Sequence, residues 1–210
     1  MRLLVATTNE GKLREIKRIL EPLGIEVLPP PENLSVEETG KTFLENAYLK
    51  AKAYYERFKV PTLADDSGLI VEAIAPYPGV YSSRFYEIEF GGREELKGSK
   101  DEANIRKLLR ILQNEENRKA KFVAFVVLYG KGLGIFAEGE VRGEITKEPR
   151  GNKGFGYDPI FKPEGYTQTM AELPPEEKDR ISHRGKALRR LVELLKGCES
   201  LKITLAEGLF

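Results

Sequence analysis

Apolar residues in the first sixty positions alternate between strand-like and helix-like spacing. From Leu13 to Leu23 they recur every three or four positions, which is typical of a helix with one buried face, and Gly24 is a helix-ending residue. Thr42 and Glu45 have the spacing of a capping box at the start of another helix. The elements predicted here are a strand at 3–6, a helix at 13–23, a strand at 25–28 and a helix from 42 to about 57.

Both kinds of spacing continue in the rest of the chain. Strands are predicted at 62–65, 68–74, 121–129 and 133–145, and helices at 99–113, 175–181 and 184–196. Gly130-Lys131-Gly132 separates two long apolar-rich runs and predicts a β-hairpin. The segments 75–84 and 85–98 are predicted to be irregular. Because strands and helices mix without strict alternation, the sequence predicts an α/β fold with a mixed central β-sheet and flanking helices.

Composition narrows the class of protein. The chain has 210 residues, 40% of them hydrophobic, and a formal net charge of +1, which disfavours a nucleic-acid binder that relies on bulk positive charge. The longest apolar run, 122–129, has the length of a strand and is too short for a membrane helix. A single cysteine, Cys198, cannot form an internal disulfide. We therefore expect a cytoplasmic protein that binds neither nucleic acid nor membrane.

Two adjacent carboxylates, Asp65 and Asp66, stand at the predicted end of a short strand, with apolar sequence on both sides. Neighbouring residues of a strand point to opposite faces, so one aspartate could face a cleft while the other braces the backbone. Carboxylates of this kind suit Mg²⁺, which takes one or two of them together with water and phosphate. A simple turn explains Asp-Asp-Ser-Gly equally well, and spacing does not separate the roles of Asp65 and Asp66.

Three further segments have the chemistry of a phosphate or base site. Asn9 can cap a helix whose N-terminus, with Lys12, attracts an anion. The glycine-rich segment 151–159 allows close approach of a ligand, and Phe155 offers a ring for stacking. Residues 182–186 place the single histidine among basic side chains. Ordinary capping, a loop with core aromatics and a solvated basic helix start are the alternative interpretations.

In combination these segments resemble the inosine triphosphate pyrophosphatase family, whose members are Ham1-like enzymes of non-standard purine nucleotides. The resemblance covers about residues 3–196 in order. It rests on the segments 7–12, 38–47, 65–69 with 78–82, 154–159 and 181–185. The charged segment 86–98 and the tail after Gly197 fall outside the resemblance.

The resemblance implies a two-lobed catalytic domain over residues 1–196 with a cleft between the lobes, a C-terminal tail at 197–210, a Mg²⁺ cofactor and a homodimer. It also implies hydrolysis of ITP, dITP and XTP to the monophosphate and pyrophosphate, which cleanses the nucleotide pool. Glu38 and Asp66, with Asp65 as a further candidate, would hold the metal, and Asp66 would also be the catalytic base. The implied substrate-binding residues are Thr7, Thr8, Asn9, Glu10, Gly11, Lys12, Ser67, Lys153, Phe155, Gly156, Tyr157, Asp158, Lys178, His183 and Arg184.

Two other functions remain compatible with the sequence. A Maf-like pyrophosphatase would act on pyrimidine or modified nucleotides, and a nucleotide-sensing module would bind without turnover. Two carboxylates give a triphosphate binder no electrostatic advantage unless a metal lies between protein and ligand, which favours an enzyme.

Overall fold

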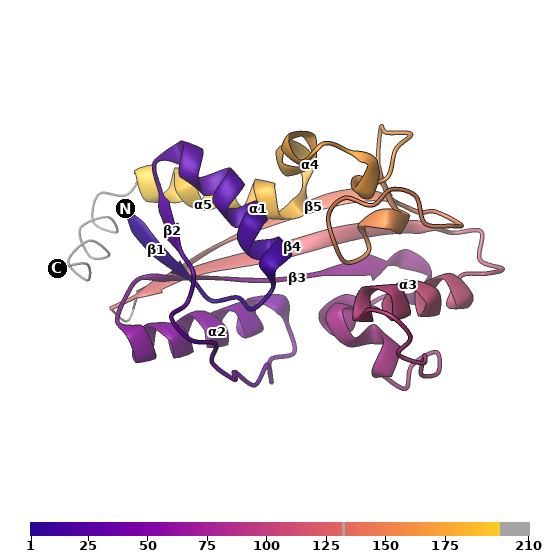
Figure 1. Ribbon diagram of the computed structural model, residues 1–210, viewed down its shortest axis with the longest axis horizontal. Coiled ribbons are helices and arrows are strands. Elements are labelled where there is room, and N and C mark those ends of the chain that lie inside the picture. Colours follow the sequence, from indigo (N-terminus) through magenta and orange to yellow (C-terminus); the bar gives the residue numbers. More distant parts are fainter. Residues whose placement is uncertain (132, 198–210) are drawn as a thin grey trace. The chain divides into compact units, whose positions relative to one another are not determined.

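The computed structural model describes residues 1–131 and 133–197, which form two compact units (Figure 1). Within the described residues, unit 1 comprises 1–66, 124–139 and 182–197, and unit 2 comprises 67–123 and 140–181. Cys198 and the tail that follows, as well as Gly132 of the predicted hairpin, lie outside the described residues. No helix in the described ranges is long and apolar enough to cross a membrane.

The sheet has six strands in the order β2-β1-β3-β4-β5-β6. The strands are β1 (Arg2–Val5), β2 (Glu26–Leu28), β3 (Thr62–Val71), β4 (Lys119–Gly130), β5 (Leu133–Ile145) and β6 (Phe161–Pro163). β1 pairs in parallel with both β2 and β3, whereas β5 and β6 are antiparallel. The predicted α/β class with a mixed sheet is therefore confirmed, and β3, β4 and β5 each run from one unit into the other.

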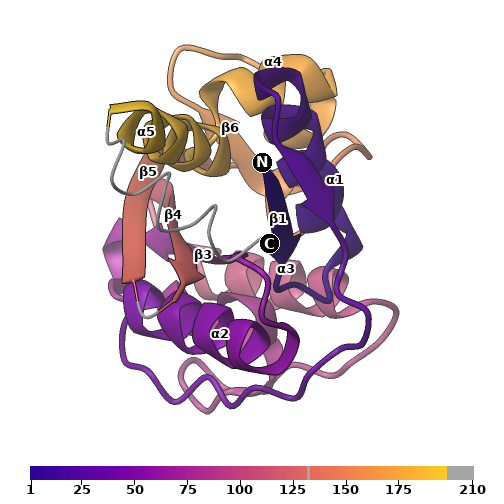
Figure 2. The same ribbon diagram turned by 90° about the vertical axis from the view of Figure 1, so that its left-hand side faces the viewer.

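In unit 1, helices cover both faces of the sheet (Figure 2). α1 (Glu10–Leu20) and α5 (His183–Gly197) pack on one face, and α2 (Phe43–Phe58) packs on the other. Successive residues of a strand point alternately to the two faces. Leu63 accordingly belongs to the core under α1 and α5, and Ala64 to the core under α2. This alternation decides where the next two residues of β3 point.

Unit 2 has its own core between the sheet and two helices, α3 (Lys100–Ile111) and α4 (Pro175–Ile181). Its largest fully buried apolar side chains include Phe85 and Phe161. Five 3₁₀ turns complete the two units: Glu21–Leu23, Glu72–Ile74, Gly79–Glu87, Asp158–Ile160 and Met170–Glu172. Ser99 and Glu102 form a capping box at the start of α3.

The structure corrects one boundary that matters for function. Residues 62–65 and 68–74 were predicted as separate strands with the aspartates at a break, but β3 is continuous from Thr62 to Val71. Asp, Ser and Gly favour turns locally, yet here they lie within a strand that has β4 as a neighbour in the sheet, and its backbone stays extended. The turn interpretation of the acidic pair is therefore wrong.

The segment 85–98 is largely irregular, as predicted, but cations of α3 hold it in place. Lys107 is fully buried and donates to the carbonyl oxygens of Phe85 and Ile88 at 2.6 and 2.8 Å. Arg106 and Arg110 donate to further carbonyls of the same segment. These bonds satisfy backbone groups that have no partner in a strand or helix.

Candidate active site

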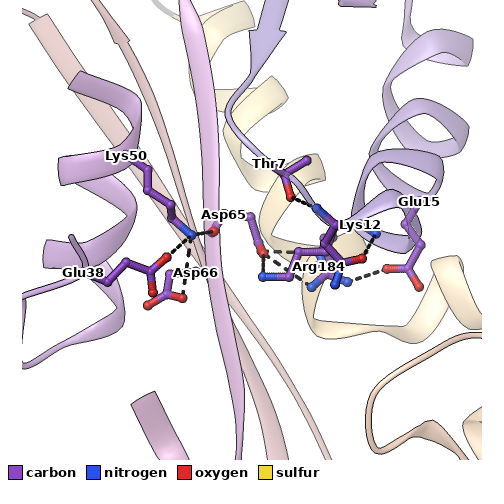
Figure 3. Close-up of polar contacts among 9 residues, drawn as sticks. Thr7, Lys12, Glu15, Glu38, Lys50, Asp65, Asp66 and Arg184 are labelled. Carbon is purple, nitrogen blue, oxygen red and sulfur yellow. Dashed lines mark hydrogen bonds and ion pairs between the residues drawn. The ribbon is translucent and has the colours of Figure 1, made fainter. Parts of the chain in front are cut away.

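Asp65 and Asp66 point to opposite faces of β3 and belong to two separate polar clusters (Figure 3). Asp65 follows the register of Leu63 and faces α1 and α5, whereas Asp66 follows Ala64 and faces α2. Both side chains are buried. All residues of the two clusters lie in unit 1.

The Asp65 cluster is a buried network of charges. Lys12 Nζ lies 2.9 Å from Asp65 Oδ1, and Arg184 Nε lies 3.3 Å from Asp65 Oδ2. Arg184 also donates to the carboxylate of Glu15. Burial alone would raise the pKa of Asp65, but the charges of Arg184 and Lys12 outweigh it and hold that pKa far below its usual range. Asp65 is therefore a fixed anion.

The local sequence explains how α1 positions Lys12 and Glu15 and how α5 positions Arg184. The Asn9 side chain accepts from the backbone N–H of Lys12 at 3.0 Å, which is the predicted N-cap of α1. Glu15 follows Lys12 by three residues and therefore lies on the same helix face. In α5, Ser182 Oγ accepts from the N–H of Gly185 at 3.0 Å, which fixes the helix start that carries Arg184.

The Asp66 cluster contains a second carboxylate and one lysine. Lys50 Nζ of α2 lies 3.1 Å from Glu38 Oε1 and 3.9 Å from Asp66 Oδ1, and it donates to the backbone oxygen of Asp65 at 2.7 Å. The loop that carries Glu38 is tied to α2, because the N–H of Gly40 donates to Asn46 at 2.8 Å. A Cβ at Gly40 would come within 2.6 Å of Asn46, so this approach requires glycine.

One oxygen of this cluster lacks a hydrogen-bond partner. Asp66 Oδ2 is buried and accepts no hydrogen bond from any described residue. Burial raises the pKa of Asp66 to about 6, against the opposing charges of Lys50 and Lys12 and with the support of Glu38. A buried carboxylate oxygen of this kind is usually satisfied by a partner such as a cation or water.

The donor set of the Asp66 cluster fits a hard divalent cation. Among the described residues there is no group of three or more His, Cys, Asp or Glu placed to hold a metal. Mg²⁺ is commonly bound through only one or two carboxylates, with water and substrate phosphate completing its shell. Glu38 and Asp66 supply that number, and Asp66 Oδ2 supplies an unpartnered ligand atom.

Unit 2 assembles a third group of predicted residues. Lys178 Nζ is 2.5 Å from Asp158 Oδ2 and 4.8 Å from the centre of the Phe155 ring. Asp158 Oδ2 also accepts from the N–H of Phe155 at 3.1 Å. Tyr157 is buried and donates its hydroxyl to the carbonyl of Ser82 at 2.6 Å. We call the segment 154–158 the aromatic loop. Within it, Asp158 accepts a hydrogen bond from the backbone of Phe155.

The remaining predicted residues are spread over both units. Thr7 Oγ1 accepts from the N–H of Asn9 at 3.1 Å at the start of α1, where Thr8 and Glu10 are exposed and Gly11 is buried. His183 is buried at the start of α5. Ser67 is half-buried on β3, and Lys153 is exposed before the aromatic loop. Contact of these residues with a substrate stays a prediction.

Three residues of these clusters were not among the predicted site residues. Glu15 lies three positions after Lys12, and Lys50 lies four positions after the buried Asn46. Helical spacing could therefore have indicated that each shares a helix face with the earlier residue. Asp101 of α3 accepts from the N–H of Gly156 at 2.8 Å across 55 residues of sequence. No local sequence pattern predicts this contact between Asp101 and Gly156.

Comparisons with known proteins agree on one family. The family model described as "Ham1 family" matches residues 3–194. A dITP/XTP pyrophosphatase of Aquifex aeolicus is 78% identical over 95% of this chain and 98% of its own length, and one from Thermococcus kodakarensis is 43% identical over 96% and 100%.

Solved structures lead to the same result. The Ham1 protein of Staphylococcus aureus matches with a TM-score of 0.78 and 40% identity, over 94% of this chain and 99% of its own. A HAM1 protein from Coxiella burnetii matches with a TM-score of 0.80 and 38% identity, over 94% and 100%. With a family model spanning residues 3–194 and relatives of such identity, the chain belongs to the Ham1 family.

Proposed function

We propose that this protein hydrolyses non-standard purine nucleoside triphosphates, dITP, XTP and ITP, to the nucleoside monophosphate and pyrophosphate, and so cleanses the nucleotide pool. The names of its relatives support this substrate class. Within the molecule, the observation that carries the proposal is the pair Glu38 and Asp66, with one buried carboxylate oxygen that no described residue satisfies.

Glu38 and Asp66 are proposed to hold a divalent metal, with Mg²⁺ as the expected ion. When bound, the ion would polarise the phosphoryl oxygens and neutralise charge that develops on them. Asp66 is also proposed as the catalytic base that accepts a proton from the attacking water. Lys50 holds the two carboxylates near each other before the ion enters.

The phosphates are proposed to meet the cations at the start of α1. Lys12 and the N-terminal end of the α1 dipole both favour an anion. Asp65 and Arg184 keep Lys12 in a defined place, since Asp65 bridges the two cations. Phe155 and Lys178, which lie together in unit 2, are the predicted contacts for the base. A homodimer and a cytoplasmic location are further predictions from the sequence and the family resemblance.

The product distribution tests the proposed function. With ITP and Mg²⁺, we expect inosine monophosphate and pyrophosphate in equal amounts with little orthophosphate, because cleavage at the α–β bond leaves the β- and γ-phosphates joined. Anion-exchange chromatography of the reaction separates these products. Orthophosphate released in two steps through a diphosphate would contradict the proposal.

A nucleotide panel separates the alternatives. Preference for pyrimidine or modified nucleotides would favour the Maf-like interpretation. Tight binding of ITP by calorimetry without any product would favour the nucleotide-sensing module.

A further inference from the structure

The backbone of the aromatic loop in unit 2 contains two glycines that give it wide conformational freedom. Gly154 and Gly156, on either side of Phe155, have φ angles of +70° and +63°, in the left-handed region that favours glycine. The loop itself belongs to no strand or helix before Asp158. Because glycine has wide conformational freedom, hydrogen bonds from outside the loop must select one orientation of the Phe155 ring.

Three hydrogen bonds between a side chain and the backbone help to fix the loop, in addition to the contacts of Lys178 with Asp158 and with the Phe155 ring. Asp158 accepts from the N–H of Phe155, and Tyr157 is anchored to Ser82 through its hydroxyl. The third contact is the bond from the N–H of Gly156 to Asp101 Oδ2, at 2.8 Å. Asp158 acts on the N–H of Phe155 and Tyr157 on a later residue of the loop. Asp101 acts from outside the loop on the peptide that directly follows Phe155, whose carbonyl accepts from the N–H of Asp158 at 3.2 Å. Asp101 is therefore placed to control the orientation of that ring.

The helix that carries Asp101 is itself firmly anchored. Ser99 and Glu102 form the capping box at the start of α3. Further along the helix, Lys107 and Arg110 donate to carbonyls of the segment 85–98. The carboxylate of Asp101 thus projects from a fixed support, and a hydrogen bond between a carboxylate and an N–H is stronger than one between neutral groups.

We propose that Asp101 is a positioning residue for base recognition: it fixes the peptide after Phe155 so that the ring is oriented before a purine arrives. This inference rests on the proposed function, in which Phe155 contacts the base. Without Asp101 the loop would have to be ordered at the moment of binding, which weakens binding. The residues of unit 1 proposed to bind phosphate and metal would be unaffected. The substitution should therefore raise KM and leave kcat unchanged.

The test compares Asp101→Ala, Asp101→Asn and the control Glu102→Ala. For Asp101→Ala we expect KM for ITP to rise about tenfold, the usual effect of losing one charge-assisted hydrogen bond, with kcat within about twofold. Asp101→Asn retains an acceptor oxygen and should recover most of the loss. Glu102→Ala weakens the capping box in the same helical turn, so Tm should fall while KM stays unchanged.

Two ligands locate the effect. Inosine monophosphate contains the base, and its Kd by calorimetry should rise in Asp101→Ala in parallel with KM. Pyrophosphate lacks the base, and its inhibition constant should stay unchanged.

An unchanged KM and Kd in Asp101→Ala would overturn the inference, as would an equal loss in Glu102→Ala or a parallel loss of pyrophosphate binding. If the wild-type protein released no pyrophosphate from ITP, the proposed function would fail. The Kd for inosine monophosphate would then still decide the role of Asp101, and no binding by the wild type would overturn both.

Discussion

Asp66→Asn is expected to reduce kcat for ITP by about 100-fold or more while leaving the metal-free protein more stable at pH 8. The loss of rate follows from removing a metal ligand and proton acceptor at nearly constant volume. The gain in stability follows from the buried position of Asp66, where Oδ2 has no hydrogen-bond partner among the described residues. An amide at that position carries no charge that must be desolvated.

The sign of the stability effect comes from the pKa of Asp66. That pKa is about 6 in the folded protein against an ordinary value of 3.8. Below 3.8 the carboxyl is neutral in both the folded and the unfolded chain. As the pH rises toward 6 the unfolded chain loses its proton first, so the contribution of Asp66 to the free energy of unfolding falls and is lost above that pH. About two pKa units correspond to about 3 kcal/mol.

Thermal unfolding in the presence of a chelator measures this effect. We expect the difference in Tm between Asp66→Asn and wild type to widen from pH 5 to pH 8, and added Mg²⁺ to raise Tm in wild type alone. Asp65→Asn is the matched control, because it changes the neighbouring carboxyl on the other face of β3. It should lower Tm, since Lys12 and Arg184 would both lose their contact with the Asp65 carboxylate. Near-normal turnover of Asp66→Asn at saturating Mg²⁺ would contradict the assignment.

Arg184→Ala is expected to destabilise the protein by about 3–5 kcal/mol, a fall in Tm of roughly 10 °C. Arg184 is 2% exposed and forms ion pairs with both Asp65 and Glu15. Its removal takes the guanidinium from both carboxylates and leaves Glu15 buried without that partner. Arg190 lies on the exposed side of the same helix, so Arg190→Ala should have only a small effect.

A double variant separates the loss of the Glu15–Arg184 ion pair from other causes of a lower free energy of unfolding. Adding Glu15→Gln to Arg184→Ala removes the buried negative charge that has lost Arg184 as its partner, so part of the lost stability should return. Unfolding by urea provides the free energies for this double-mutant cycle. If the two substitutions were simply additive, the Glu15–Arg184 pair would not be coupled.

The same variant addresses the role predicted for Arg184 in substrate binding. Its guanidinium offers only donors, which match the 6-oxo group of ITP and not the 6-amino group of ATP. In the structure these donors meet Asp65 and Glu15. If Arg184 also contacts the base, the ratio of kcat/KM for ITP to that for ATP should narrow in the double variant. An unchanged ratio would assign Arg184 a purely structural role.

The sequence alone was sufficient for most of the fold and for the choice of acidic pair. Apolar spacing and capping residues predicted every α-helix of the described residues and the main strands, because amphipathic periodicity reports which face of an element is buried. The 3₁₀ helix Gly79–Glu87 was missed, since its segment was predicted to be irregular. Motif order indicated the family, which the comparisons then confirmed. The capping residues Asn9 and Thr42 were also predicted from the sequence, since capping is a local interaction.

The different surroundings of Asp65 and Asp66 were decided by the tertiary structure. A period of two puts neighbouring strand residues on opposite faces, but it does not say which helices cover each face. Packing of α1 and α5 on one face brings two cations to Asp65, and packing of α2 on the other brings Glu38 and Lys50 to Asp66. Such contacts join residues distant in sequence, as Asp101 and Gly156 also do, and only the folded chain fixes the electrostatic environment that gives equal side chains different chemistry.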